Sequence, residues 1–424
     1  MAEEDRFGEA RFKVLLAGKL YDGVSQAATE SMAVLIDGSR ILGIGPQSEV
    51  RPPAGVTCEE LRFDSAFVLP GLIDVHTHLM LAADGRTYEQ AMVDSDEVMA
   101  LGGVRNLELH LRSGVTTLRD NGARNQIAFA LKEGLRRGYI RGPRLLASGR
   151  SITCSGGHFH ICNAVADGPD ALRREVRKLV HEGADFIKVM ATGGGTARTL
   201  PGYASYSEEE LKVVVEEAHR FGKLTDAHTR ARAGMINAAR ARIDCVEHVE
   251  FLDPDMVARY DPRVADMLLE AGTYLSPTLQ ASIGYATMVR LKQKQEREPL
   301  SASELEALRR CERAMEIRLD VLRRLLDAGF AGRLIAGTDA GCGELAFGHL
   351  QYDIELMAAG GMSNVQAVKT ATSDAARALG IDHLVGSIAP GKEADFLVVE
   401  GDPLSSIADL SRVVAVIQAG RRVF

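Results

Sequence analysis

The sequence lacks several features that would place it in a special class of protein. Its 424 residues contain no tryptophan, and their formal charge at pH 7 is −8. No basic stretch followed by an apolar run opens the chain, and no apolar stretch is long enough to cross a bilayer. We therefore expect a cytoplasmic location and no membrane partner. Because nucleic acids attract basic surfaces, the acidic balance also argues against nucleic acid as a partner.

The cysteines do not form a recognisable motif. The six of them are scattered without CxxC spacing, so we expect free thiols in a reducing compartment. No repeat of solenoid type and no low-complexity linker is present. The chain is 46% hydrophobic and 25% charged, which is an ordinary balance for a globular protein with a large core.

Most of the chain repeats one plan, in which a short apolar run ends in a polar residue and a helix-period segment follows a loop. Near-continuous apolar runs are typical of parallel strands that are covered on both faces. The runs that we predict as strands are 72–78, 115–120, 144–148, 185–191, 223–228, 244–249, 273–278 and 333–339.

Eight alternating strand–helix units predict a closed (β/α)8 TIM barrel, because an open parallel sheet would leave two unpaired edges. An open doubly wound sheet is the alternative. Two of the helices have capping-box signals at their starts, Ser207 with Glu210 and Ser303 with Glu306. The second signal opens a long charged helix over 303–326.

The two ends of the chain have a different pattern. Short alternating runs flank an Asp37–Gly38 turn, which is typical of a β-hairpin, and further strands are predicted at 394–400 and 413–418. We expect the N- and C-terminal segments to pair into a small β-sandwich domain. The predicted domains are therefore 1–66 with 388–424 for the sandwich, and 67–387 for the α/β barrel.

Histidines at strand ends are the sharpest chemical signal. His76 and His78 lie two apart on the first strand, so both imidazoles point to one face. Lys188 lies within an apolar strand, where an unpaired charge is costly. The strand ends carrying His228, His248 and Asp339 are predicted to meet at the same barrel rim, where such folds place their active sites. Neutral imidazole is a common zinc ligand, so the pattern favours a metal site over core packing.

These residues and their setting (PGLIDVHTHL, ADFIKVMATGG, DAHTRA, EHVEFLD, GTDAG and PGKEADFLVVEGDPL) resemble the amidohydrolase superfamily over nearly the whole chain. The closer similarity is to its prolidase and imidazolonepropionase-like branch. The resemblance implies a cytoplasmic, metal-dependent hydrolase of an amide C–N bond in a dipeptide, an Xaa-Pro-like peptide or an N-acyl amino acid. It also implies a homo-oligomer, for which the helix over 303–326 is a possible contact surface or simply a solvated one.

The resemblance further implies two divalent metal ions, with zinc as the expected metal. One ion would be held by His76, His78 and Asp339, the other by His228 and His248. Lys188, carboxylated by CO2, would bridge them, since burial favours the neutral amine that reacts with CO2. The metals would lower the pKa of a bridging water, and Asp339 would move its proton to the leaving amine.

Two loops supply candidate substrate contacts. The loop after the third strand contains a Gly-Gly-His sequence, and the resemblance implies that this histidine lies at the substrate site. We therefore favour His158 over His160 as a donor to the substrate carbonyl, with a solvated loop histidine as the alternative. In the loop after the fourth strand, Tyr203 and Tyr206 compete for the same role, or both are packing residues. The glycine run at 193–195 precedes no Lys-Ser/Thr pair and is not a phosphate motif.

Arg230 is a departure from the commoner pattern of the family and either binds a substrate carboxylate or faces solvent. Three other functions stay open on this sequence. They are hydrolysis of a xenobiotic aryl-urea, carbamate or thiocarbamate, a one-metal deaminase or cyclic-amide hydrolase, and a non-catalytic protein on a degenerate barrel. The lysine at position 188 argues against the one-metal enzymes, and the six filled ligand positions argue against a degenerate barrel.

Overall fold

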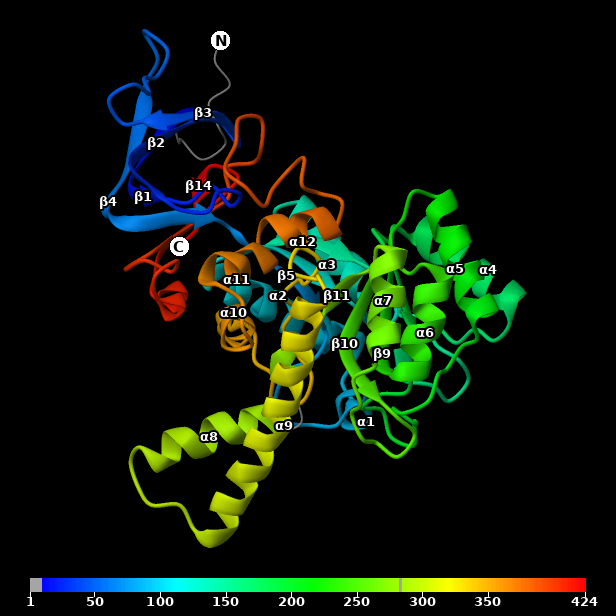
Figure 1. Ribbon diagram of the computed structural model, residues 1–424. Coiled ribbons are helices and arrows are strands. Elements are labelled where there is room, and N and C mark those ends of the chain that lie inside the picture. The colour runs from blue at the N-terminus through cyan, green and yellow to red at the C-terminus, as the bar shows by residue number, and fades with distance from the viewer. Residues whose placement is uncertain (1–9, 163, 282–283) are drawn as a thin grey trace.

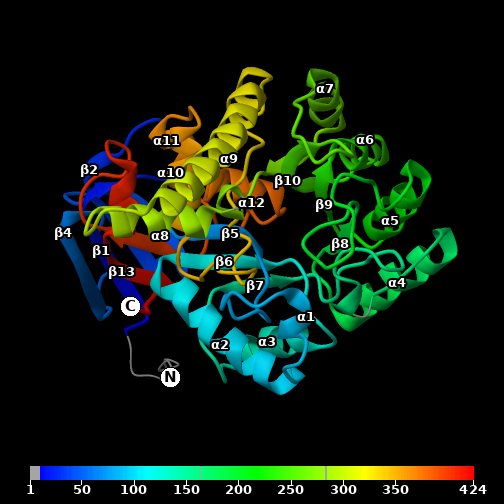
Figure 2. The ribbon, with the colours of Figure 1, turned by 90° about the horizontal axis from the view of Figure 1, so that it is seen from below.

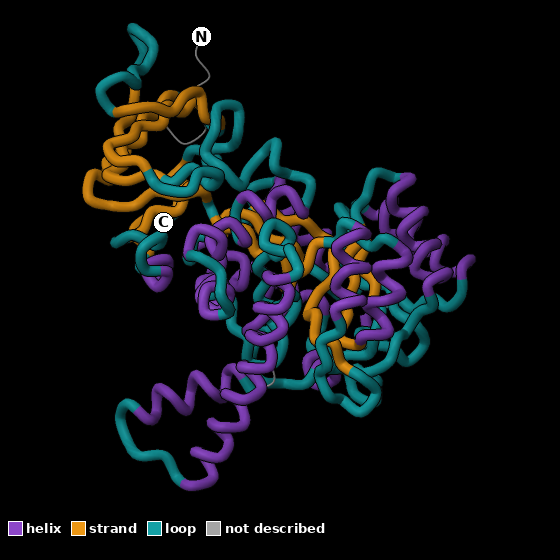
Figure 3. Tube along the Cα trace, in the orientation of Figure 1, coloured by secondary structure: helices purple, strands orange, loops and turns teal. Residues whose placement is uncertain are grey.

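The computed structural model describes residues 10–162, 164–281 and 284–424. Figure 1 shows a β-rich part beside both termini and a larger part in which helices surround strands. Figure 3 separates the same two groups of strands by colour. No helix among the described residues combines the length and the apolar character that crossing a membrane requires.

The strands and helices have these bounds. The strands are β1 (Phe12–Leu20), β2 (Thr29–Asp37), β3 (Arg40–Pro46), β4 (Cys58–Pro70), β5 (Leu72–Thr77), β6 (Val115–Asp120), β7 (Arg144–Ala147), β8 (Ile187–Met190), β9 (Thr225–Ala231), β10 (Cys245–Leu252), β11 (Tyr274–Ser276), β12 (Phe396–Val399), β13 (Val413–Gln418) and β14 (Arg421–Arg422). The helices are α1 (Tyr88–Ala91), α2 (Asp96–Arg112), α3 (Ile127–Arg136), α4 (Pro169–Glu182), α5 (Glu208–Arg220), α6 (Arg232–Ala241), α7 (Pro262–Ala271), α8 (Tyr285–Gln295), α9 (Ala302–Asp327), α10 (Leu350–Ala359), α11 (Asn364–Thr370) and α12 (Ser373–Ala378).

The larger part contains two parallel sheets, a four-stranded one in the order β11-β10-β9-β8 and a three-stranded one in the order β5-β6-β7. Figure 2 shows helices α3 to α7 on the outside of these strands. Seven of the eight predicted barrel strands are present, and the run Val115–Asp120 has the predicted bounds. The α/β class with parallel strands is therefore confirmed.

The predicted closure into one eight-stranded barrel is not shown for the described residues, because the segment 333–339 is not a strand. Its backbone groups are divided among three neighbours: Ile335 N–H donates to Leu275, Val75 N–H donates to Ala336, and Ala336 N–H donates to Thr370. The two sheets instead meet through isolated bridges, Leu275 with Leu334, Thr77 with Ala340 and Ile152 with Val189.

The terminal strands form one seven-stranded sheet in the order β14-β13-β12-β4-β1-β2-β3. The hairpin at Asp37 is confirmed, since β2 and β3 pair antiparallel with Asp37 opposite Arg40. The chain ends do pair, with Phe396 opposite Pro70 across β12 and β4. A single sheet takes the place of the predicted two-sheet sandwich, which is not confirmed.

Helices α8 and α9 form a hairpin that projects from the rest of the molecule (Figure 1). The capping box predicted for α9 at Ser303 is wrong by two residues. Ser301 caps the helix through the Glu304 N–H, and Glu304 bonds back to Ser301 and also pairs with Lys294 at 2.6 Å. The capping box at Ser207 and Glu210 is confirmed.

Candidate active site

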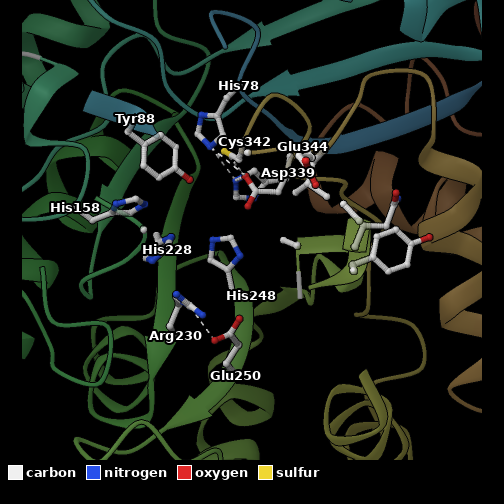
Figure 4. A pocket seen from close by; sticks show the side chains of 18 of the residues that line it. His78, Tyr88, His158, His228, Arg230, His248, Glu250, Asp339, Cys342 and Glu344 are labelled. Atoms are coloured by element: carbon white, nitrogen blue, oxygen red, sulfur yellow. Dashed lines mark hydrogen bonds and ion pairs between the residues drawn. The ribbon is translucent and has the colours of Figure 1, made fainter. Parts of the chain in front are cut away.

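Two histidines and an aspartate converge at the C-terminal ends of the central strands. The Nε2 atoms of His76 and His78 lie 3.4 Å apart, and each lies 3.4 Å from Oδ1 of Asp339. All three side chains are buried, and their ligand atoms lie within 4.8 Å of one another. Figure 4 shows His78 and Asp339 directed toward one another.

Neighbouring groups fix the orientation of both imidazoles. His76 Nδ1 lies 2.8 Å from Glu247 Oε2, and His78 Nδ1 lies 3.1 Å from the carbonyl of Gly122. Because the Gly122 carbonyl can only accept, Nδ1 of His78 carries a proton, whereas His76 Nδ1 and Glu247 Oε2 lie at an ion-pair distance without hydrogen-bond geometry. Asp339 is held in the left-handed region with φ of 58°, which is strained for a non-glycine residue. Its N–H donates to the His76 carbonyl at 2.8 Å, and this bond fixes the strained turn.

Three further predicted ligands line the same cavity, whose volume is about 310 Å³. The ring centroids of His228 and His248 lie 4.4 Å apart, and His248 lies 5.2 Å from His76. His248 Nδ1 lies 2.9 Å from the Thr278 hydroxyl. The fully buried Lys188 donates from Nζ to Asp226 Oδ2 at 2.9 Å.

A buried network of opposite charges lies beneath these residues. Arg119 donates to Glu247 at 2.5 Å and lies 3.5 Å from Asp226. Asp226 therefore faces both Arg119 and Lys188, while Glu247 faces Arg119 and His76. Two cations against two carboxylates leave this network close to neutral, which reduces the cost of burying it.

The protonation states suit metal binding. Burial, followed by the charges of neighbouring groups, holds the pKa of His76, His228 and His248 well below its ordinary value, so these imidazoles are neutral. Burial works against ionisation of Asp339, but His76 and His78 outweigh it and lower the pKa of this carboxyl. Burial works against the protonated form of His78, but Asp339 outweighs it and raises the pKa of this imidazole, so His78 must release a proton when a metal binds. The neutral imidazoles of His76, His228 and His248 and the ionised carboxylate of Asp339 are the donor types that a divalent cation such as zinc prefers. The residues present therefore fit a metal.

His158 enters the cavity from the loop after β7. Its Nδ1 accepts from the Thr196 hydroxyl at 2.8 Å and lies 3.3 Å from the Thr196 N–H, while the same hydroxyl accepts from the Phe159 N–H. With donors around Nδ1, the ring proton resides on Nε2. Burial lowers the pKa of His158 to about 3, so the ring stays neutral. It can therefore donate from Nε2 into the cavity.

Arg230 lies in the cavity wall and is half-buried (Figure 4). Its Nε donates to Glu250 Oε2 at 2.8 Å, and the other oxygen of Glu250 lies 3.1 Å from Nη1 of Arg318. Two guanidinium groups thus share one carboxylate, which leaves an excess positive charge at this wall.

Comparison with known proteins decides the family. A family model described as the Amidohydrolase family matches residues 67–423. The chain belongs to the amidohydrolase family. This amidohydrolase is 28% identical to ochratoxinase of Aspergillus niger over 94% of its own length and 83% of the other chain. It is 24% identical to imidazolonepropionase of Pseudomonas fluorescens over 89% of this chain and 90% of that one. The solved structure of an Xaa-Pro dipeptidase with bound methionine matches with a TM-score of 0.80 and 26% identity, covering 97% of this chain and 99% of the other.

The family and these hydrolases identify the protein as an enzyme that hydrolyses an amide C–N bond. The family is typically metal-dependent, and the buried group of His76, His78 and Asp339 is a candidate metal site of this amidohydrolase.

Not every residue predicted for the site comes to the cavity. Among the described residues, His160, Tyr203 and Tyr206 do not line it. His160 bonds to the Gly157 carbonyl, Tyr203 is 50% exposed, and the Tyr206 hydroxyl donates to the Ala166 carbonyl. Tyr88 supplies a phenol to the cavity instead (Figure 4).

Sequence reasoning missed Tyr88, Glu247 and Asp226. A signal for Asp226 was available, because it lies two residues before His228 and so shares its face of β9. Tyr88 lies at the start of α1, after a loop whose course no periodic pattern reveals. Its ring occupies space that Gly195 leaves open, since a Cβ at this glycine would lie 2.7 Å from Tyr88 Cε2.

Proposed function

We propose that this amidohydrolase cleaves the amide bond of N-acyl amino acids or dipeptides, and that Arg230 binds the carboxylate of the amino acid released. The observation that carries the proposal is the excess positive charge at the cavity wall, where Arg230 and Arg318 share Glu250. A guanidinium binds a carboxylate through paired charge-assisted hydrogen bonds. Because Glu250 engages Nε, the terminal nitrogens of Arg230 can face the substrate.

The proposal includes a binuclear centre in a (β/α)8 arrangement. His76, His78 and Asp339 would hold one divalent ion, His228 and His248 the other, and carboxylated Lys188 would lie between them. A carbamate nitrogen keeps one N–H, so the hydrogen bond from Lys188 to Asp226 can persist. When bound, the ions would lower the pKa of a water and polarise the scissile carbonyl.

The chain's own residues would complete the reaction. His158 donates from Nε2 to the substrate carbonyl oxygen, where negative charge develops. Asp339 accepts a proton from the attacking water and passes it to the leaving nitrogen, so that the amine departs uncharged. Arg230 holds the leaving amino acid in one orientation, which keeps the scissile bond beside Asp339 and His158.

The test compares Arg230→Met with wild type on N-acetyl-L-phenylalanine and on its uncharged amide. Loss of a paired charge-assisted contact should lower kcat/KM for the acid roughly 100-fold. The uncharged amide should change far less. Arg232→Met is the matched control, since Arg232 pairs with Asp253 and Asp261 outside the cavity. An equal loss for both substrates would refute the role of Arg230.

The metal centre is tested by elemental analysis of protein grown with zinc, which should give about two ions per chain. Chelation should lower Tm as well as activity, since a ligand that binds only the folded state stabilises it. The proposed domains, 1–66 with 388–424 and 67–387, and self-association of the chain stay predictions, which limited proteolysis and sedimentation velocity can check.

A further inference from the structure

The segment that brings Asp339 to the cavity lies against β5 without being a strand. Backbone hydrogen bonds join the two from Val75 N–H to the Ala336 carbonyl and from Asp339 N–H to the His76 carbonyl. Gly337 permits this close approach, since a Cβ there would lie 2.8 Å from the His76 Cβ. Because the segment lacks the regular pairing of a strand, side-chain contacts must help to set the position of Asp339.

Asp74 of β5 supplies such contacts to both segments. Its Oδ1 accepts from the His76 N–H and from the Thr338 N–H, each at 3.1 Å, and its Oδ2 accepts from the Thr338 hydroxyl at 2.7 Å. Nε2 of His110, from α2, lies 3.2 Å from the same Oδ2. Asp74 and Thr338 are buried, so water does not compete for these bonds. The carboxylate thereby joins residues that are 264 positions apart in the chain.

The Thr338 hydroxyl also binds the chain on the far side of Asp339. It accepts from the Ala340 N–H at 3.0 Å, and it lies 3.4 Å from the His76 carbonyl. Threonine hydroxyls that bind the backbone two residues further on stabilise tight turns. Asp339, between the two bonded residues, has a φ of 58°, a strained value that persists only where the surrounding contacts hold it. One hydroxyl therefore supports both the turn and its attachment to β5.

We propose that Thr338 and Asp74 are positioning residues, which hold Asp339 against His76 and His78 before any metal ion binds. Oδ1 of Asp339 lies 3.4 Å from both Nε2 atoms. A site whose groups are ordered on folding does not have to be ordered again when its ion arrives, and this favours binding. The inference rests on the proposed function, in which Asp339 is a metal ligand and carries the proton of the attacking water.

The experiment compares Thr338→Val and Thr338→Ser with wild type. Valine has the shape of threonine but no hydroxyl, so it loses the bonds to Asp74 and Ala340, whereas serine keeps the hydroxyl. Zinc affinity is measured by titrating the metal-free proteins against a competing indicator. Thr338→Val should bind zinc roughly 10- to 100-fold more weakly than wild type, the usual effect of removing a group that orients a metal ligand. The affinity of Thr338→Ser should lie closer to wild type than to Thr338→Val.

Thr273→Val is the matched control. Thr273 is also fully buried, and its hydroxyl donates to the Ile243 carbonyl at 2.9 Å, but it precedes β11 and does not line the cavity. Both valine variants should have a lower Tm than wild type in the presence of a chelator, because each loses a buried hydrogen bond. Thr273→Val should nevertheless keep the zinc affinity of wild type. If Thr338→Val also kept it, the role of Thr338 would be structural only and the proposal would be overturned.

Crystal structures of the metal-free proteins test the same proposal without zinc. Asp339 should keep its left-handed conformation in wild type, Thr338→Ser and Thr273→Val, and its Oδ1 should move away from His76 and His78 in Thr338→Val. An unmoved Asp339 in Thr338→Val overturns the proposal. If wild type itself binds no zinc, the metal centre of the proposed function fails, and the position of Asp339 in these structures decides whether Thr338 holds it.

Asp74→Asn takes the place of Thr338→Val if the valine variant does not fold. An amide has one acceptor oxygen, so its NH2 group must face either the Thr338 hydroxyl or the N–H groups of His76 and Thr338. The same loss of zinc affinity and the same movement of Asp339 are expected. Wild-type affinity, or an unmoved Asp339, again overturns the proposal.

Discussion

Replacing Glu247 by glutamine should weaken both the fold and the metal site. The two oxygens of this carboxylate contact different partners: Oε2 lies 2.8 Å from His76 Nδ1, and Oε1 lies 2.5 Å from Arg119. Glutamine has nearly the same shape, but it offers one acceptor oxygen where glutamate offers two. Its NH2 group would therefore face a donor on one side or the other.

The magnitude follows from burial. Glu247 and Arg119 are almost fully buried, and removing one partner of a buried ion pair costs about 3–5 kcal/mol. Arg119 keeps Asp226 at 3.5 Å and a bond to the Val75 carbonyl, so we expect the lower end, about 3 kcal/mol. Loss of the group that orients a ligating histidine typically weakens metal binding roughly 10- to 100-fold.

The assay is urea unfolding in the presence of a chelator, which separates the fold from the metal, together with zinc titration against a competing indicator. Glu108→Gln is the control, because Glu108 pairs with Arg112 on an exposed helix face and should change the free energy of unfolding by roughly 0.5 kcal/mol or less. A Glu247→Gln protein with the stability and the zinc affinity of wild type would refute this account of the buried network.

Three further changes test other parts of the structure. Tyr206→Phe should lose about 1 kcal/mol of unfolding free energy, measured in urea, yet keep kcat/KM, because its hydroxyl bonds to a backbone carbonyl outside the cavity. Gly194→Ala should lower kcat at least tenfold in a steady-state assay, because the added Cβ would lie 2.4 Å from the His158 ring. Gly102→Ala is the control: this glycine lies on an open surface of a helix, where alanine should raise Tm. Burial raises the pKa of Asp353 from 3.8 to about 7, so its contribution to stability is present below pH 4 and is lost as pH rises through 7. Asp353→Asn should therefore gain stability over wild type between pH 5 and pH 8, by up to about 4 kcal/mol, and a Tm difference independent of pH would contradict this.

The sequence predicted the central strands well because their burial on both faces leaves a continuous apolar run, as at Val115–Asp120. It failed at 333–339, where hydrogen bonds are divided among several neighbours, a matter of tertiary contacts. It also failed at the start of α9, where two overlapping capping-box patterns are present and the pairing of Glu304 with Lys294 favours the earlier one.

The candidate site was predictable where its residues lie on strands, because side chains alternate between the two faces of a strand. His76, His78, Lys188, His228 and His248 lie in or directly after strands, and all five line one cavity. The residues that orient them were harder to find. Glu247 and Arg119 look like ordinary interruptions of apolar strands, and only their proximity across β6 and β10 reveals a pair. The two tyrosines proposed for the carbonyl contact, Tyr203 and Tyr206, do not line the cavity, because the course of a loop depends on packing such as that of Tyr88 against Gly195.

The pairing of β12 with β4 has a consequence for synthesis on the ribosome. One edge of β4 can pair with β1 as soon as both strands have been synthesised. Its other edge stays unpaired until Phe396–Val399 of β12 has been synthesised. At ordinary elongation rates this delay lasts roughly 15 to 60 seconds, during which a row of backbone donors and acceptors stays open to other nascent chains. A slower rate of translation should therefore change the yield of soluble protein more than the stability of the folded protein. The same is expected of a substitution on the edge of β4 that pairs with β12.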